Sequence, residues 1–298
     1  MFDWDDLRVF IAAARGGTTA AAAQRLGLDA TTVGRRIAAL ESALKATLFI
    51  RTRSGLQLTA TGARLLETAG SAEIAMNVAA EIAQADAVAG AVRISAPEGF
   101  GAQILAAALP GLSRRHPHLS IELIANPGLL SPLKREVDMA ITLSAPLSTR
   151  LLVEPLTDYQ LGLFAAPDYL AARGVPAAVE ALSKHDLVGY VEDQIYAPEL
   201  RYLEEINPAL RTRLASSSLR AQRQMIGAGG GIGVLPCFMA AGLERVLARE
   251  VRLTRRFWIS THRDVAATAR VRAVRNWLKA LVQAERAVLV PVEVAAAH

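Results

Sequence analysis

Hydrophobic residues near the N-terminus recur every three or four positions, which is the spacing of an α-helix that buries one face. The first such stripe consists of Trp4, Leu7, Phe10, Ile11 and Ala14. Gly16 and Gly17 then end this predicted helix, and Thr18 is a suitable N-cap for a second helix over 19–26. The pattern therefore predicts two short helices joined by a glycine turn.

A third helix is predicted after another glycine, Gly27, which supplies the backbone freedom for a tight turn. Asp29 is a good N-cap for a helix over 30–44. The residues that this helix would bury are Val33, Ile37, Leu40 and Leu44. Arg35 and Arg36 lie off that stripe, so we expect both to project outward. Helix, short turn and helix is the layout of a helix-turn-helix unit.

Two short apolar runs follow over 48–59 and surround a basic Ser-Gly turn, which predicts a two-stranded wing. Thr59 is a suitable N-cap for a long helix that reaches about Ala89. At 1.5 Å per residue this helix would be about 45 Å long. Its apolar positions have no local partner in the sequence, so we expect dimerisation through this helix.

Positive charge is concentrated in the same region. Residues 25–64 contain seven Lys and Arg residues and two acidic residues, whereas the flanking segments 1–24 and 65–90 are net negative. A basic block of this kind is the electrostatic footprint of a nucleic-acid-binding face, although a solvated helix surface can have the same pattern. The whole chain has a net charge of +5 over 298 residues, which by itself indicates little about a partner. A second arginine-rich stretch, 252–275, has no assigned role.

From Gly90 the pattern changes to strands that alternate with helices. Strands are predicted over 91–96, 119–124, 137–142, 151–163, 187–191, 232–235 and 257–261. Helices are predicted over 99–115, 167–173, 200–205, 217–226 and 268–284. This alternation indicates an α/β domain with a largely parallel sheet. Composition agrees with a folded chain, because 52% of the residues are hydrophobic and 20% are charged.

Motifs for catalysis or metal binding are weak in this sequence. The five histidines are scattered, and the close pair His116 and His118 has no further His or Cys at zinc spacing. The glycine-rich segment 227–233 follows a predicted helix and precedes a strand, which is the reverse of a dinucleotide-binding loop and favours a helix C-cap. Cys237, the one cysteine, lies in an apolar run and is expected to be a buried, inert thiol. We therefore expect no enzyme, no cofactor and no metal site.

We also expect a soluble, cytoplasmic protein without membrane contact. No run of residues approaches the roughly 18 to 20 apolar positions of a membrane-spanning helix. The acidic N-terminus lacks the basic and then apolar layout of a signal peptide.

Several separated blocks in the first 62 residues resemble the N-terminal signature of LysR-type transcriptional regulators. The blocks are Ala22-Ala23-Gln24-Arg25-Leu26, Val33-Gly34-Arg35-Arg36-Ile37-Ala38-Ala39-Leu40-Glu41, Leu48-Phe49-Ile50-Arg51 and Leu58-Thr59-Ala60-Thr61-Gly62. The chain departs from the family where Asp29 and Gly34 replace the usual Ser, Thr31 the usual Pro, and Lys45 the usual Gly. These departures concern which DNA sequence is read rather than whether DNA is bound.

The C-terminal part is similar to the two-lobed effector-binding domain of the same family, which itself resembles periplasmic solute-binding proteins. The matching blocks are 92–97, 137–141 and 229–236. The resemblance implies a winged helix-turn-helix domain, otherwise all-α, over 1–58, a linker and dimerisation helix over 59–89, and an α/β effector-binding domain over 91–286. That domain would consist of lobe I, 91–161 and 258–286, and lobe II, 162–257. Residues 287–298 are expected to form a loose tail.

Helix position and family resemblance together indicate candidate DNA contacts. They are Thr18, Thr19, Ala30, Thr31, Thr32, Arg35, Arg36, Arg51 and Arg53. Side chains in the first turns of the third helix would reach base edges in the major groove. The threonines that begin the second helix suit a phosphate, and the wing arginines suit phosphates or the minor groove. For Arg51, an ion pair with Glu41 is the alternative.

Candidate effector contacts follow from the rule that ligands of two-lobed α/β domains bind beyond the carboxyl ends of strands and near helix N-termini. They are Ser95, Pro97, Glu98, Gly99, Thr142, Ser144, Gln194, Ser217 and Ser218. Each of these could equally be a helix-cap or turn residue. Glu98 places a carboxylate near a helix N-terminus, where anionic ligands usually bind. We therefore hypothesise that the effector is neutral or cationic, or that Glu98 points away.

The sequence thus predicts a sequence-specific DNA-binding transcriptional regulator that is controlled by a small-molecule effector bound between two lobes. Its partners would be double-stranded operator DNA, the effector and further copies of itself in a homodimer or homotetramer, with RNA polymerase as an additional candidate. The alternative is a cytoplasmic small-molecule-binding protein whose winged helix contacts DNA only non-specifically or binds protein. A large affinity ratio over random DNA at physiological salt would separate the two.

Overall fold

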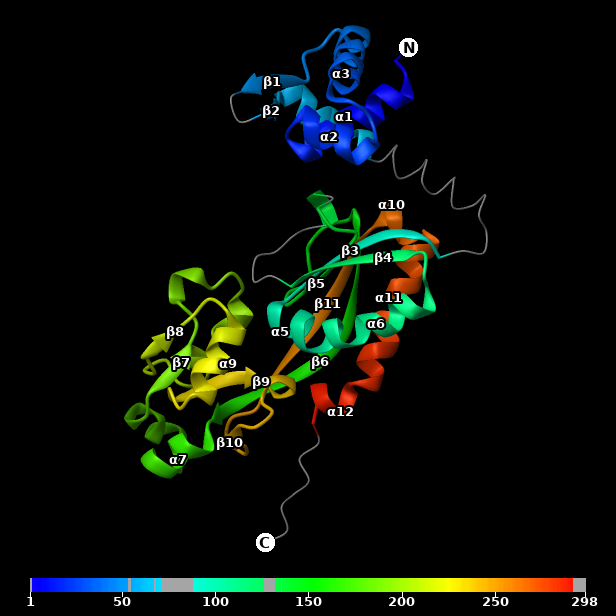
Figure 1. Cartoon of the computed structure of the whole chain (residues 1–298). Coiled ribbons are helices and arrows are strands. Elements are labelled where there is room, and N and C mark those ends of the chain that lie inside the picture. The colour runs from blue at the N-terminus through cyan, green and yellow to red at the C-terminus, as the bar shows by residue number, and fades with distance from the viewer. Residues whose placement is uncertain are drawn as a thin grey trace. The chain divides into compact units, whose positions relative to one another are not determined.

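The computed structural model describes residues 2–52, 55–66, 68–70, 88–125, 132–134 and 136–291. The chain forms two compact units, Met1–Ala85 and Asp86–His298, which we call unit 1 and unit 2 (Figure 1). Much of the predicted long helix and of the C-terminal tail, together with Arg53, lies outside the described residues. Within the described part of the chain, no helix is both long and apolar enough to cross a membrane.

Unit 1 begins with three helices at the predicted places. They are α1 (Trp4–Gly16), α2 (Thr19–Leu26) and α3 (Ala30–Leu44). Gly17 and Gly27 follow α1 and α2 in the left-handed conformation, with φ of 69° and 66°, which glycine adopts without steric cost. Thr18 caps α2 by accepting from Ala21 N at 3.1 Å, as predicted. Residues 60–66 and 68–70 are also helical.

The core of unit 1 lies between these helices and the first wing strand. Phe10 on α1, Val33 and Leu40 on α3, and Leu48 are fully buried. The predicted stripe of α1 is wrong at Trp4, whose side chain is 57% exposed. Trp4 occupies the first turn of α1, and its ring lies 5.8 Å from that of Phe2 rather than in the core.

The wing consists of β1 (Phe49–Thr52) and β2 (Gly55–Leu58), paired antiparallel as predicted. Leu56 N donates to Gly17 O at 2.7 Å, so the wing is tied to the turn between α1 and α2. A Cβ on Gly55 would lie 2.3 Å from Gly17 O, which explains why glycine is needed there. Thr59 caps the following helix by accepting from Gly62 N at 3.0 Å.

Unit 2 contains a nine-stranded sheet in the part of the chain that the structure describes. Its strands are β3 (Gly90–Ala96), β4 (Leu119–Ala125), β5 (Met139–Thr142), β6 (Leu151–Ala165), β7 (Leu187–Gly189), β8 (Leu214–Ala215), β9 (Ile232–Pro236), β10 (Glu244–Val246) and β11 (Leu253–His262). The spatial order is β4-β3-β5-β11-β6-β9-β7-β8, with β10 beside β6.

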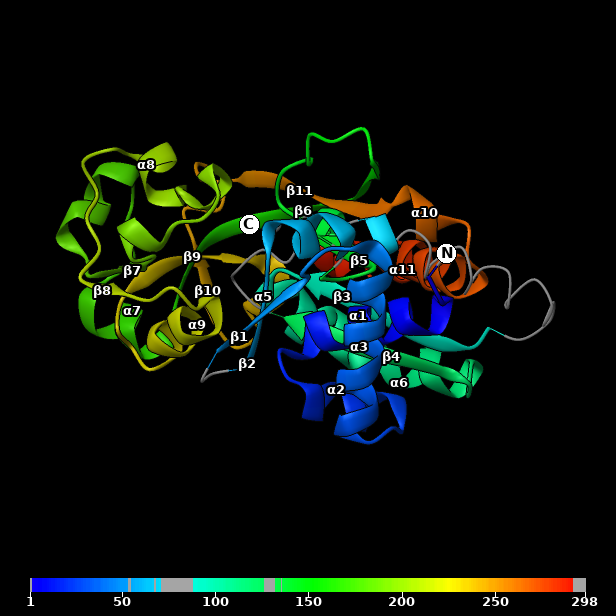
Figure 2. The same ribbon diagram turned by 90° about the horizontal axis from the view of Figure 1, so that it is seen from above.

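The prediction of a largely parallel sheet is wrong, because the sheet is mixed. β3 runs parallel to β4 and β5, and β7 runs parallel to β8 and β9. Between these groups β11 is antiparallel to both β5 and β6, and β6 is antiparallel to β9. The two long strands run from one group to the other (Figures 1 and 2). The expected lobe boundaries, 161/162 and 257/258, fall within them.

Helices and short turns connect the strands of unit 2. The helices are α5 (Glu98–Phe100), α6 (Ala106–Arg115), α7 (Pro167–Arg173), α8 (Tyr202–Ile206), α9 (Leu219–Gly227), α10 (Arg263–Ala266), α11 (Ala269–Ala284) and α12 (Arg286–Leu289). A π-helical segment, Gly101–Leu105, joins α5 to α6. Short 3-10 turns occur at Pro132–Lys134, Val179–Lys184, Glu192–Gln194, Pro198–Leu200 and Cys237–Met239. Cys237 is only half-buried, which differs from the expected buried thiol.

The glycine-rich segment ends α9 and leads into β9, as predicted. Gly229 and Gly231 have φ of 80° and 138°, which favour glycine. A Cβ on Gly231 would lie 2.2 Å from Asp186 O, so the backbone passes directly against the chain before β7. This segment is therefore a packed turn.

Gly62→Ala should destabilise unit 1, because the new Cβ would lie 2.2 Å from the carbonyl oxygen of Leu48. Overpacking of this kind costs about 1–3 kcal/mol. Hydrogen exchange of the α3 amides in the full chain, including that of Leu40, should quicken accordingly. Gly34→Ala is the matched control, since nothing lies within 4 Å of its Cβ position, and it should slow exchange by removing backbone freedom. Equal protection in the two variants would contradict this packing.

Candidate nucleic-acid interface and inter-lobe cavity

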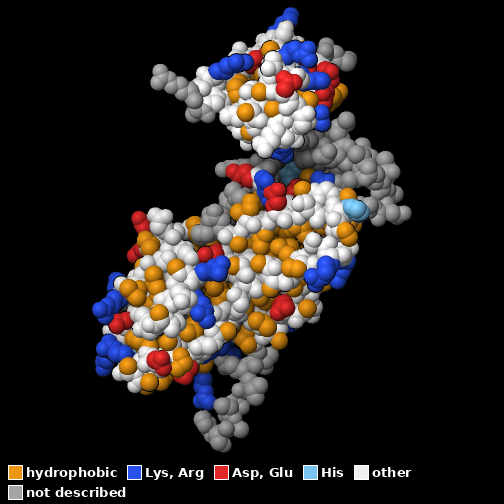
Figure 3. Space-filling model, in the orientation of Figure 1, with side chains coloured by type: hydrophobic (Ala, Val, Ile, Leu, Met, Phe, Trp, Pro, Cys, Tyr) orange, Lys and Arg blue, Asp and Glu red, His pale blue; other side chains and the backbone are white. Residues whose placement is uncertain are grey.

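The first turns of α3 present a small exposed face. Ala30, Thr31 and Arg35 are exposed, while Thr32 and Arg36 are half-buried. Thr31 and Arg35 are four residues apart in the helix and therefore lie on the same side of it. Lys and Arg side chains are visible on the surface of unit 1 (Figure 3). An exposed guanidinium beside a hydroxyl at the start of a helix can donate to base edges.

Asp29 and Thr32 fasten the beginning of α3. Asp29 Oδ1 accepts from Thr32 N, and Asp29 Oδ2 accepts from the Thr32 hydroxyl, both at 2.7 Å. These hydrogen bonds, the side-chain one first, hold the pKa of the Asp29 carboxyl below its ordinary value. The hydroxyl hydrogen of Thr32 is thus used within the protein, whereas its oxygen lone pairs can still accept from DNA.

Arg36 differs from the expectation that it projects outward. Its Nη1 lies 2.8 Å from Asp5 Oδ2 and 3.1 Å from Asp6 Oδ1. Both carboxylates belong to the first turn of α1, so the ion pairs hold α3 against α1. In the folded unit Arg36 is therefore a positioning residue for the exposed face of α3.

The remaining candidates for DNA contact lie on α2 and the wing. The Thr18 side chain already accepts from the α2 backbone, and Thr19 is half-buried beside it. Arg51 is exposed on β1. The alternative pairing partner, Glu41, instead accepts from Leu48 N at 2.6 Å and Phe49 N at 3.2 Å through Oε1. Arg51 is consequently presented to solvent next to the exposed Ile50.

Two adjoining cavities lie between the expected lobes of unit 2. The inner cavity, about 30 Å³, is bounded by Pro97–Phe100 on one side and by Tyr190, Tyr196 and Leu219 on the other. The outer cavity, about 300 Å³, is lined by Thr142, Ser144 and Ser260 among others. Leu143 and Tyr196 line both cavities, so the two cavities adjoin at these residues. The outer cavity is large enough for a small organic molecule, and the inner one for one or two waters.

The structure brings together most of the candidate effector residues. Pro97, Glu98, Gly99 and Ser217 line the inner cavity, Thr142 and Ser144 line the outer one, and Ser218 bonds to Glu98. Two candidates lie elsewhere. Ser95 is 4% exposed within β3, and Gln194 is exposed and lines neither cavity.

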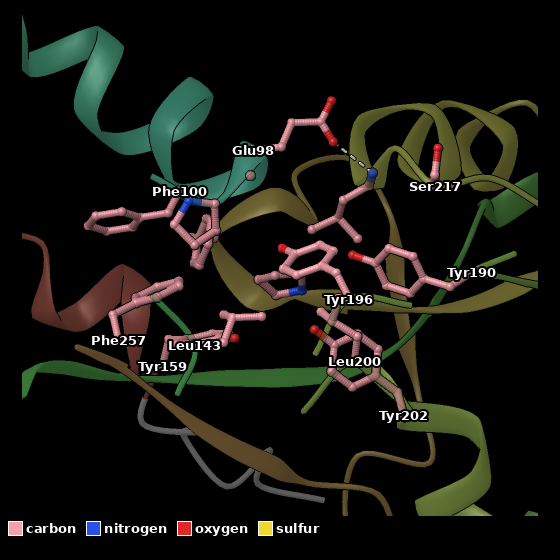
Figure 4. Close-up of a pocket in the computed structure, with 15 residues that line it drawn as sticks. Glu98, Phe100, Leu143, Tyr159, Tyr190, Tyr196, Leu200, Tyr202, Ser217 and Phe257 are labelled. Atoms are coloured by element: carbon pink, nitrogen blue, oxygen red, sulfur yellow. Dashed lines mark hydrogen bonds between the residues drawn. The ribbon is translucent and has the colours of Figure 1, made fainter. Parts of the chain in front are cut away.

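Sequence reasoning missed the aromatic lining of the inner cavity. Four of the five tyrosines, Tyr159, Tyr190, Tyr196 and Tyr202, surround it (Figure 4). They come from β6, from the chain that follows β7, and from α8, so they do not form one face of a single helix or strand. The signal available was local, because three tyrosines occur within 190–202 of a chain that is only 5% aromatic.

These phenols remain protonated throughout the physiological range. Burial, followed by the nearby Glu98 and Glu199 carboxylates, raises the pKa of Tyr196 to about 12. Burial is also the main cause that raises the pKa of Tyr190, Tyr159 and Tyr202 above the usual value. The cavity therefore offers neutral hydroxyl groups and aromatic faces to a ligand.

Glu98 lies at a helix N-terminus, but at that of α9 rather than that of its own helix, α5, near which the sequence placed it. Its Oε1 accepts from the Ser218 hydroxyl at 2.8 Å. Its Oε2 accepts from Leu219 N at 2.8 Å, which is the dashed line in Figure 4. Arg220 N also donates to Oε2, at 3.5 Å. The carboxylate thus occupies the N-terminal end of α9. Among the described residues, no group of three or more His, Cys, Asp and Glu side chains could hold a metal ion.

Comparisons with known proteins cover both units. The chain matches the family model of the bacterial regulatory helix-turn-helix protein, lysR family, over residues 4–63, and that of the LysR substrate binding domain over residues 44–283. It is 29% identical over 195 residues to the HTH-type transcriptional regulator CrgA of Neisseria meningitidis, covering 63% of this chain and 64% of that protein. The alignment therefore spans just under two thirds of that relative.

Two further relatives are similar. The Mau operon transcriptional activator of Paracoccus denitrificans is 26% identical, with 92% of this chain and 95% of that protein covered. The HTH-type transcriptional regulator DmlR of Escherichia coli is 32% identical, with 60% and 59% covered.

Solved structures share the fold. The structure of CrgA, described as a LysR-type transcriptional regulator, has a TM-score of 0.58 and 24% identity, and the match covers 95% of this chain and 99% of that one. A full-length OxyR variant from Pseudomonas aeruginosa has a TM-score of 0.72 and 20% identity, with 95% and 98% covered. The predicted fold class, a winged helix-turn-helix joined to an α/β ligand-binding domain, is confirmed.

The Asp29 carboxyl should titrate below its ordinary pKa of 3.8, and Thr32→Val should move it back toward that value by removing the larger hydrogen bond. Because the folded-state pKa is lowered, this group stabilises the fold above pH 3.8 and loses that effect as the pH falls through the folded pKa. The pKa is measured by following the chemical shift of the Asp29 carboxyl carbon as a function of pH. Thr31→Val is the control and should leave the titration unchanged; an unchanged Asp29 pKa in Thr32→Val would refute the arrangement.

Proposed function

The chain belongs to the LysR family of bacterial transcriptional regulators, and we propose that it binds operator DNA through unit 1 under the control of a small effector held in unit 2. The observation that carries the proposal is the exposed face of α3, where Thr31 and Arg35 stand free of the core at the start of a helix that Asp29 caps. A helix placed in the major groove in this way reads bases through its N-terminal side chains.

Each candidate DNA contact then has a proposed role. Ala30, Thr31, Thr32 and Arg35 face the base edges, with Arg35 suited to a bidentate contact with guanine. Thr18 and Thr19 bring the N-terminus of α2 to a phosphate. Arg51 and Arg53 in the wing neutralise phosphates or enter the minor groove. Arg36 acts mainly by holding α3 on α1, through Asp5 and Asp6.

The assembly is a homodimer or a homotetramer in this proposal. Paired units 1 would place two α3 helices in successive major grooves of a pseudo-palindromic site. The domain boundaries are those that the sequence implies, namely 1–58, 59–89 and 91–286, with lobes 91–161 plus 258–286 and 162–257 and a tail over 287–298. In support of subunit contact, α6 exposes Ala106, Ala107 and Pro110, and apolar side chains gather over this helix (Figure 3).

The cellular setting follows from the same proposal. The protein works in the cytoplasm, without enzymatic activity, and RNA polymerase is a further candidate partner at the promoter. The effector enters the outer cavity, where Thr142 and Ser144 offer polar contacts. Because Leu143 and Tyr196 border both cavities, a ligand there would also alter the packing of the inner one.

Arg35→Ala should abolish sequence-specific binding while leaving the oligomer intact. Selection of bound genomic fragments by the wild-type protein supplies the operator, and gel shifts then compare operator with random DNA. We expect the preference for the operator to fall by about 5- to 150-fold, because one bidentate base contact is worth about 1–3 kcal/mol. Arg93→Ala is the control, since it removes an equal charge from unit 2, where Arg93 pairs with Glu122 at 2.5 Å. Wild-type operator preference in Arg35→Ala would contradict the proposed role.

Arg51→Ala should weaken binding to operator DNA and to random DNA by the same factor, because a phosphate contact does not depend on the base sequence. The slope of log affinity against log salt should decrease in magnitude by about 0.9, the value for one released counterion. The DNA affinities of Arg51→Ala and of the control Arg93→Ala, measured at several salt concentrations, test this prediction. An altered operator preference with an unchanged salt slope would mean that Arg51 reads bases.

A further inference from the structure

The N-terminal end of α9 is the natural place for an anion in the inner cavity. A helix N-terminus presents backbone N–H groups without intrahelical partners and carries partial positive charge. Leu219 N and Arg220 N are the first such groups of α9, and Ser218 is its N-cap. Leu219 and the neighbouring Ser217 line the inner cavity.

This anion position is already filled by the protein itself. Glu98 comes from the opposite side of the cavity, 120 residues before Ser218, and accepts from the Ser218 hydroxyl and from both backbone N–H groups. A ligand carboxylate placed there would have to displace Glu98 or lie against it. Two carboxylates at hydrogen-bond distance repel strongly in a partly buried site.

The approach of Glu98 to α9 is built into the local packing. A Cβ on the next residue, Gly99, would lie 2.6 Å from Met239 Sδ and 3.0 Å from Leu219 Cδ2. Glycine at this position therefore lets α5 lie against Met239 and Leu219 without displacing either side chain. The same turn places Phe100 in the aromatic cluster, 4.5 Å from Phe257 between ring centroids. The packing of Gly99 and Phe100 therefore fixes the position of Glu98 at the start of α9.

The other groups that face the cavities do not compensate a negative charge. The polar groups of the inner cavity, besides Glu98, include Ser217 and protonated tyrosine hydroxyls, and the outer cavity adds Thr142, Ser144 and Ser260. The neighbouring Arg255 is already occupied, since its Nη2 pairs with Glu205 and its Nε donates to Glu199 O at 3.2 Å. An anion that enters such a site therefore loses its hydration without gaining a positive partner.

From this arrangement we propose that Glu98 is a built-in substitute for an anionic ligand, and that it restricts the effector to molecules without negative charge that have an apolar or aromatic body. The inference rests on the proposed function, because it names the chemical class that the effector site accepts. The apolar body occupies the outer cavity and packs on Leu143 and Tyr196, and its polar end meets hydroxyl groups. Removal of the Glu98 side chain would turn the same end of α9 into an anion site.

Calorimetry with two probes of the same body tests this on the full-length protein. Benzyl alcohol is uncharged, and benzoate is anionic at neutral pH. Wild type should bind the alcohol at least tenfold more tightly than benzoate. In Glu98→Ser, the freed N–H groups of Leu219 and Arg220 should raise the benzoate affinity at least tenfold, while the affinity for the alcohol should change by less than threefold.

Two further variants sharpen the result. Glu192→Ser is the matched control, because it removes an exposed carboxylate that lines neither of these two cavities, and both affinities should stay as in wild type. Glu98→Gln keeps the size and an acceptor for Leu219 N but removes the charge, and it should show a smaller gain for benzoate. Thermal unfolding checks each variant, so Glu98→Gln decides the question if Glu98→Ser does not fold.

Several outcomes would overturn the proposal: tighter binding of benzoate than of the alcohol by wild type, no gain for benzoate in either folded Glu98 variant, or no binding of the alcohol by wild type. The proposed function fails separately. Its failure would appear as no operator preference in the fragment selection, a measurement that does not involve the cavities.

Discussion

The antiparallel pairing of β6 with β11 is the interaction on which unit 2 depends. It runs from Leu151 paired with His262 to Leu161 paired with Leu253, with an irregularity between Phe257 and Trp258. From Leu161 onward β6 pairs with β9, while β11 pairs with β5 on its other side, so the β6–β11 pair joins the two groups of parallel strands. Tyr159 and Phe257 stack across this pair, 4.1 Å between ring centroids, beneath the inner cavity. The floor of the cavity is therefore formed by the strand pair that joins the two halves of the sheet.

The two sides of the inner cavity, α5 and α9, are joined by polar contacts. Glu98 on α5 and the N-terminus of α9 are joined by charge-assisted hydrogen bonds across the cavity. Breaking this contact would leave a partly buried carboxylate and two N–H groups without partners, which is unfavourable. An effector can therefore move α5 relative to α9 only if it binds one arrangement of the two helices more tightly than the other. Unit 1 uses the same principle on a smaller scale, since Arg36 joins α3 to Asp5 and Asp6 at the start of α1. Arg36 and Glu98 were both predicted from the sequence to contact a ligand. In the structure each also holds its own helix in place, Arg36 holding α3 against α1 and Glu98 holding α5 against α9.

Local patterns predicted the elements well because they act over a few residues. Thr18, Asp29 and Thr59 cap the helices that they were expected to begin, and Gly17 and Gly27 adopt the left-handed turns. Errors arose where tertiary contacts decide. Trp4 matches the helical stripe but lies beyond the reach of the core, and Arg36 lies off the stripe but meets two carboxylates from another helix. The direction of β6 and β11 relative to their neighbours is not contained in an alternation of strands and helices, which is why the sheet proved mixed.

The sequence by itself determined the helix-turn-helix, the wing, the α/β character of the second unit and the family, because caps, glycine turns and periodicity are local and the family blocks are read directly from the residues. It also placed Glu98, Thr142 and Ser144 at the ends of strands, where a ligand would be met. Only the tertiary structure decided what these residues face. The four tyrosines around the inner cavity come from separate segments, and the contact of Glu98 with α9 joins residues 120 positions apart. Such contacts depend on how β6 and β11 bring the two halves of the sheet together, a constraint that no local pattern expresses.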